Sequence, residues 1–201
     1  MNKIKKKLLP LAAAFAAATL GMGMASSAQA TSMKIGRYTS QPIGHYEFCQ
    51  QVPEDCRANG KNVHPDRLTP AKWNTLVRIN SGVNSMIQPR TDFEMWGQEE
   101  IWSYPVKYGD CEDYVLLKRH DLIAAGFNPG NLLITVVLQP NGDGHAVLTV
   151  RTDHGDFILD NLVGTVLDWR DTRYRYLKRQ SSANAGKWVD IIDERTSVAR
   201  N

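Results

Sequence analysis

The sequence predicts an α+β fold in which N-terminal helices pack on an antiparallel sheet. Two segments, 69–88 and 110–126, carry apolar residues at helical spacing. From residue 132 onward, short runs of apolar and β-branched residues alternate with turns rich in Gly and Pro. Helices followed by strands, rather than helices alternating with strands, are typical of the α+β class.

The first 30 residues have the pattern of a secretory signal peptide. A lysine-rich start precedes an apolar, Ala-rich run, and Ala28-Gln29-Ala30 forms a small-x-small cleavage site. Cleavage after Ala30 leaves residues 31–201, a chain of 171 residues that we expect to form one domain. The alternative is an uncleaved anchor. We therefore predict a periplasmic or secreted protein.

The charge balance argues against a nucleic-acid partner. Removing the signal removes four lysines and no acidic residue, which leaves 20 basic against 21 acidic residues. No basic excess remains to attract phosphates. A late basic run, 170–179, is interleaved with Asp171 and two tyrosines, and we expect it to form a solvated strand face.

The first predicted helix begins at Thr69 and Pro70, which suit the cap and the first helical position, and it runs to about Gln88. The preceding segment, 31–66, has no long period and is expected to be rich in loops. An aromatic-rich connection, 89–108, leads to the second helix.

Cys111 opens this second helix. Asp110 suits its N-cap, and Gly126 suits the position after its end. Free N–H groups and the helix dipole at this end favour a thiolate. The alternative is a small buried thiol at a helix start.

Strands are expected at 132–138, 145–151 and 157–160, followed by shorter ones at 166–169, 174–177 and 188–192. Polar, Gly-containing turns separate the first three, which indicates an antiparallel meander.

Cys49 and Cys56 enclose a short loop that contains Pro53 and two acidic residues. An oxidising compartment favours a disulfide between them, which leaves Cys111 as a free thiol. In the alternative pairing, Cys111 bonds to one of the two.

A cysteine nucleophile needs a base and a group that orients the base. His120 lies nine residues after Cys111 on the same helix, about 180° around and ~13 Å along, so it cannot reach the thiol. His145 begins a strand, and Asp160 ends the next one, so the two should be neighbours across an antiparallel pair. A strand-starting histidine can also be purely structural.

Three blocks carry a family resemblance: 109–114 (GDCEDY), 144–147 (GHAV) and 159–162 (LDNL). Together they resemble the bacterial transglutaminase-like cysteine proteinases, the family of the LapG periplasmic proteases. Segments around Cys49 and Trp188 also fit a branch of that family. The resemblance covers nearly the whole chain after residue 30.

The resemblance implies a transglutaminase-like or papain-like fold and a catalytic triad of Cys111, His145 and Asp160. It also implies calcium bound through Asp110 and Glu112, although the same two residues could serve only the helix start. A surface-adhesin substrate and a membrane receptor that holds the protease inactive belong to the same family pattern. The Cys49/Cys56 pair departs from that pattern.

These observations predict a thiol endopeptidase that acts on an envelope or surface protein. The Cys111 backbone N–H should be one oxyanion donor, and Gln98 or Trp102 is expected to supply another. Two alternatives are a protein transglutaminase, which forms the same acyl-enzyme, and a non-catalytic binding module on the same fold.

Overall fold

The computed structural model describes residues 32–61 and 63–195, so the predicted signal peptide and its cleavage site lie outside the described residues. Seven strands form one antiparallel sheet in the order β1-β9-β8-β4-β5-β6-β7. Their bounds are β1 Ile35–Thr39, β4 Leu132–Leu138, β5 Gly144–Thr152, β6 Gly155–Leu159, β7 Leu167–Asp168, β8 Arg175–Ser181 and β9 Asn184–Ile191. Among the described residues, no helix combines the length and apolar content needed to cross a bilayer.

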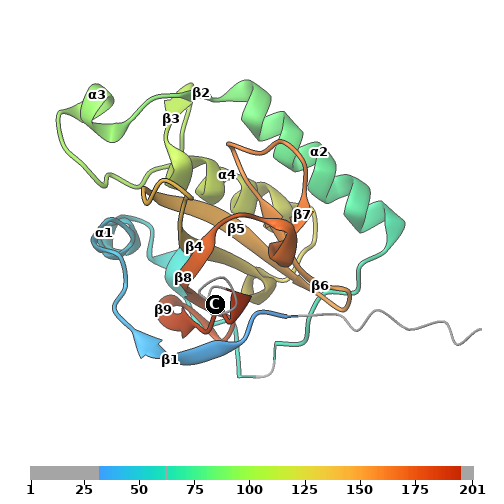
Figure 1. The fold of residues 1–201 in the computed structure, drawn as a ribbon. Coiled ribbons are helices and arrows are strands. Elements are labelled where there is room, and N and C mark those ends of the chain that lie inside the picture. Colours follow the sequence, from blue (N-terminus) through green and yellow to red (C-terminus); the bar gives the residue numbers. More distant parts are fainter. Residues whose placement is uncertain (1–31, 62, 196–201) are drawn as a thin grey trace, which may run out of the picture.

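Two long helices cover one face of this sheet (Figure 1). α4 (Cys111–Ala124) packs on β4 and β5, and α2 (Pro70–Met86) packs on α4. Both helices were predicted, and the Thr69 hydroxyl caps α2 by accepting a hydrogen bond from the Lys72 N–H at 3.2 Å. The α+β class is confirmed.

The sheet separates two apolar clusters. The larger one joins the two helices to inward residues of the central strands. It includes Leu76 of α2, Leu116 of α4, Leu148 of β5 and Leu159 of β6. A smaller cluster lies on the opposite face and includes Val147, Ile158 and Trp169. Because side chains alternate along a strand, neighbouring residues of β5 and β6 serve different clusters.

Strands β4 to β7 form the predicted meander, but the chain then departs from it. After β7 and the short 3₁₀ helix η3 (Trp169–Asp171), the chain crosses back, and β8 pairs with the free edge of β4. β9 pairs with β8, and β1 forms the edge beyond β9. The β4–β8 and β1–β9 pairings join segments far apart in the sequence, so no short turn reveals them, whereas β8 and β9 form a hairpin across Ser182 and Ala183.

The expectation of a loop-rich segment at 31–66 was wrong in part. This segment contains the edge strand β1, the helix α1 (Ile43–Gln51) and the 3₁₀ helix η1 (Pro53–Cys56). Only Gly44, His45 and Phe48 of α1 are buried, so the helix has no clear apolar face for a sequence pattern to detect.

The aromatic connection also holds regular structure. Its two ends form a small parallel pair, β2 (Gln88–Pro89) with β3 (Tyr108–Gly109), and it includes the helix α3 (Asp92–Trp96). A capping box between Thr91 and Glu94 begins α3. Through this pairing, the segment around residue 92 lies beside the start of α4.

The late basic run is not wholly solvated. Arg179 is buried and donates to the buried Asp156 carboxylate at 2.9 Å. The expectation of a solvated face is therefore wrong at this position, because the Arg179 side chain reaches the smaller apolar cluster, where its Nη1 lies 3.7 Å from Met33 Sδ.

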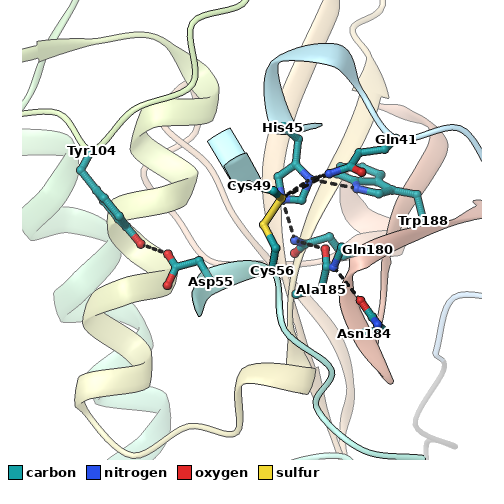
Figure 2. Close-up of a disulfide and its surroundings, with 11 residues drawn as sticks. Gln41, His45, Cys49, Asp55, Cys56, Tyr104, Gln180, Asn184, Ala185 and Trp188 are labelled. Carbon is teal, nitrogen blue, oxygen red and sulfur yellow. Dashed lines mark hydrogen bonds between the residues drawn. A yellow bond between two sulfur atoms is a disulfide. The ribbon is translucent and has the colours of Figure 1, made fainter. Parts of the chain in front are cut away.

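The predicted disulfide between Cys49 and Cys56 is confirmed, and it joins α1 to η1. Figure 2 shows His45 directed toward this bond, with Gln180 and Trp188 around the ring. Burial lowers the pKa of His45 to about 3, with a smaller contribution from the Arg119 charge, so the ring is neutral. Cys111 is free, and the alternative pairing is wrong.

We expect the double substitution of Cys49 and Cys56 by Ser to lower the free energy of unfolding by about 2–3 kcal/mol, because the unfolded chain regains its loop entropy. Urea unfolding measures this difference. A reducing agent should shift the wild-type curve and leave that of the variant in place. Coincident curves for the oxidised wild type and the variant would contradict the prediction.

Candidate active site

Cys111 lies half-buried at the first position of α4, beside the start of β5. Its Sγ donates a hydrogen bond to Glu112 Oε2 at 2.9 Å. The backbone N–H of Ala146, the residue after His145, also interacts with the sulfur. The nucleophile predicted from sequence therefore adjoins the strand that carries the predicted base.

His145 and Asp160 form a buried pair. The His145 Nε2 atom lies 2.9 Å from Asp160 Oδ1. β5 and β6 pair with Leu148 opposite Leu159, which puts His145 and Asp160 two positions apart in register on the same face. With Nε2 engaged, Nδ1 is the ring nitrogen left for a proton from the thiol.

Asp160 is held by several further contacts. The Tyr174 hydroxyl donates to its Oδ2 at 2.5 Å, and the Leu162 N–H donates to its Oδ1 at 2.9 Å. Burial alone would raise the pKa of Asp160, but the hydrogen bonds from His145 and Tyr174 and the charge of His145 hold it below its ordinary value. Asp160 is therefore an ionised group that fixes the imidazole.

Cys111 and His145 share one cleft of about 450 Å³. Trp102, Glu100 and Lys178 also line it. The Trp102 indole N–H donates to Glu100 Oε2 at 3.3 Å, so this predicted oxyanion residue lies in the cleft with its donor engaged. Gln98 is exposed and lines none of the cavities that contain Cys111, so the structure does not bring it to the thiol.

The thiol is more strongly protonated than the helix start suggests. Burial raises the pKa of Cys111, and the charge and hydrogen bond of Glu112 raise it further, whereas the Ala146 N–H lowers it. The negative charge of Glu112 thus opposes the helix dipole.

Three carboxylates gather at the start of α4: Asp92, Asp110 and Asp113, with ligand atoms all within 4.8 Å of one another. Burial is the largest cause that raises the pKa of each, to about 8 for Asp110 and about 7 for Asp113. A carboxylate cluster in low dielectric needs a compensating charge to ionise.

The cluster fits a hard cation that prefers oxygen ligands. Each carboxylate has one buried oxygen with no hydrogen-bond partner among the described residues. Asp110 occupies the N-cap position but makes no capping bond, and its Oδ2 instead accepts from the Asp92 N–H at 3.3 Å. A capping hydrogen bond therefore does not explain the aspartate at position 110.

The sequence interpretation named Asp110 and Glu112 as calcium ligands, and the structure places the two differently. Asp110 lies in the cluster, whereas Glu112 contacts the thiol and Asp110. Asp92 and Asp113 were missed. Asp113 lay within the quoted motif, and Gly109 of that motif is packed against it: a Cβ at residue 109 would lie 2.8 Å from Asp113 Oδ2. No local signal identifies Asp92.

The fold is similar to that of solved structures from one bacterium. Calcium-bound LapG of Legionella pneumophila shares 25% identity over 61% of this chain and 71% of its own, with a TM-score of 0.51. A second LapG structure from that organism shares 22% identity over 79% of this chain and 84% of its own, also with a TM-score of 0.51. No curated protein matches the chain.

The family comparison covers most of the sequence. The sequence model of the bacterial transglutaminase-like cysteine proteinases matches residues 35–196, which include Cys111, His145 and Asp160. The structural likeness to LapG supports the transglutaminase-like fold predicted above. The chain belongs to the bacterial transglutaminase-like cysteine proteinase family.

Proposed function

We propose that this protein is a thiol endopeptidase that cuts an exported protein through Cys111, His145 and Asp160. One observation carries the proposal: His145, hydrogen-bonded to Asp160, lines the same cleft as a free cysteine at a helix start. A binding module would have no need for this arrangement, which suits acyl transfer.

In the first step, His145 takes the thiol proton and Cys111 Sγ bonds to the carbonyl carbon of the substrate. The C–N bond then breaks, and His145 returns the proton to the leaving nitrogen. Water, deprotonated by His145, attacks the thioester and releases the second product together with the thiol. Asp160 holds the imidazole throughout and stabilises its charged form.

The carbonyl oxygen becomes negative in the tetrahedral states. The backbone N–H of Cys111, at the start of α4, is the donor we propose for it, in line with the partial positive charge at a helix N-terminus. The Trp102 indole is the second donor, provided that the substrate displaces its bond to Glu100.

The predicted signal peptide confines the enzyme to the periplasm or the exterior, so we propose a substrate in the cell envelope. A membrane receptor that holds the enzyme inactive stays a prediction from the family resemblance.

We also propose that Asp92, Asp110 and Asp113 hold calcium, supported by the buried, unpartnered oxygens of the cluster and by the calcium-bound LapG structure. A bound cation would supply positive charge that compensates these carboxylates beside the nucleophile.

Replacing Cys111 or His145 by Ala should abolish turnover, and Asp160→Asn should reduce it on the order of 10⁴-fold, by analogy with the serine triad. The measurement compares the new N-termini of envelope proteins, by mass spectrometry, between cells with wild-type and variant enzyme.

The surface pair His154 and Asp153, with 2.7 Å between Nδ1 and Oδ1, provides a matched control. His154→Ala should leave processing unchanged. If Cys111→Ala left every envelope protein processed as before, the protease proposal would fail. Incorporation of a labelled amine into glutamine by the wild type alone would favour a transglutaminase.

Calcium added to chelator-treated protein should raise the melting temperature by roughly 5–10 °C at a hundredfold excess over its dissociation constant, which corresponds to about 2.7 kcal/mol. Asp92→Asn and Asp113→Asn should remove most of this rise. Asp121→Asn, at a partly exposed position of the same helix and outside the carboxylate cluster, should keep it. An unchanged melting temperature in the wild type would contradict the calcium site.

Glu112→Gln should speed alkylation of Cys111 by iodoacetamide near pH 8, on the order of tenfold if the thiol pKa falls by one unit. The substitution removes the negative charge that opposes the thiolate. Glu47→Gln, at an exposed position of α1, serves as the control. Equal rates for wild type and Glu112→Gln would show that Glu112 does not restrain the thiol.

A further inference from the structure

A second cavity lies beside Asp160, and neither Cys111 nor His145 lines it. It has a volume of about 360 Å³, within the range of small-molecule pockets. Asp160 and Tyr174 border it, and aliphatic side chains form much of the remaining surface: Pro140, Ile158, Leu162, Val163 and Leu167. None of these aliphatic residues has a part in the proposed chemistry.

This cavity is continuous with the surface around the nucleophile. Gln139 and Leu162 line both this cavity and the neighbouring one that contains Cys111 and His145. A chain bound across the thiol can therefore extend past the imidazole and reach the cavity without leaving the surface of the protein.

Three of the polar residues around the cavity, Asp160, Thr172 and Tyr174, are already engaged in hydrogen bonds. Asp160 accepts hydrogen bonds from the His145 ring, the Leu162 N–H and the Tyr174 hydroxyl. The Thr172 hydroxyl donates to the Trp169 carbonyl at 2.8 Å. These three groups have little hydrogen-bonding capacity left for a ligand. Gln139, Thr165, Asp171 and Arg173 also line the cavity, but most of its lining surface is apolar, so an apolar group fits it best.

Leu162 and Val163 remain exposed, at 57% and 37% of their surface. Side chains of this kind, next to one another at the rim of a cavity, gain free energy when an apolar group covers them. The occupant that fits is therefore apolar, and the continuity with the cleft makes it part of the substrate.

The direction of proton transfer determines which part of the substrate the cavity takes. The leaving nitrogen takes its proton from His145, so the segment after the scissile bond departs over the imidazole. Asp160 holds the far nitrogen of that ring, and the cavity adjoins Asp160. The cavity thus lies on the leaving-group side.

We propose that this cavity, with Leu162 and Val163 at its rim, is a substrate subsite that takes an apolar side chain from one of the first two residues after the scissile bond. The inference rests on the proposed endopeptidase function and adds a specificity to it.

The test uses the mature protein with calcium and a mixture of peptides of randomised sequence, with the new N-termini read by mass spectrometry. We expect Leu, Ile, Val, Met and Phe to be enriched among the first two residues of the released fragments. Cleaved peptides without this enrichment would overturn the subsite while leaving the endopeptidase function in place. An absence of cleavage by an enzyme with an alkylatable Cys111 would overturn both.

Variants then assign the preference to the cavity. Leu162→Lys and Val163→Lys should each lower kcat/KM for peptides with an apolar residue there on the order of tenfold, and should lower it little for peptides with Glu in its place. Val77→Lys, at an exposed position on α2 and outside the cavities described, should leave both values unchanged. An equal loss for both peptide classes in the Leu162 and Val163 variants, with melting temperatures unchanged, would contradict the assignment.

Discussion

The candidate site depends on the register of one strand pair, β5 with β6. Leu148 lies opposite Leu159, both in the larger core, and this pairing brings His145 and Asp160 to the other face. A slip of one residue would turn every side chain of β6 over and move Asp160 toward the helices. The apolar residues that fix the core thereby fix the base and its orienting group.

The same packing brings the nucleophile to the base. α4 lies on β5, and its first residue, Cys111, meets the Ala146 N–H directly after His145. The surroundings of the thiol are acidic, and ionising Asp110 and Asp113 in the fold costs free energy because burial raises the pKa of each. That cost grows as pH rises above the ordinary carboxyl range, so a cation that compensates the charge is coupled to the stability of the whole helix start.

Local patterns predicted the parts of the structure that local physics determines. Thr69 with Pro70 began α2, a cysteine after Asp110 began α4, and β-branched runs gave β4, β5 and β6. The return of β8 to β4, the edge strand β1 and the short α1 depend on partners far along the chain and leave no local signal. Asp92 was missed for the same reason: the β2–β3 pair, and not its own neighbours in sequence, brings it to Asp110.

The disulfide is linked to the cleft through α1. Gly44 approaches Trp102 so closely that a Cβ would lie 2.4 Å from the indole ring and 2.5 Å from the Glu100 carbonyl oxygen. The His45 ring packs edge-on against Trp102 and against Trp188 of the sheet, with 5.3 Å between centroids in both cases. Glu100, in this wall of the cleft, takes up a left-handed backbone conformation at φ 61°, which is strained for a residue other than glycine. Cys49 and Cys56 hold α1 in position against that wall, and Cys111 remains free beside it.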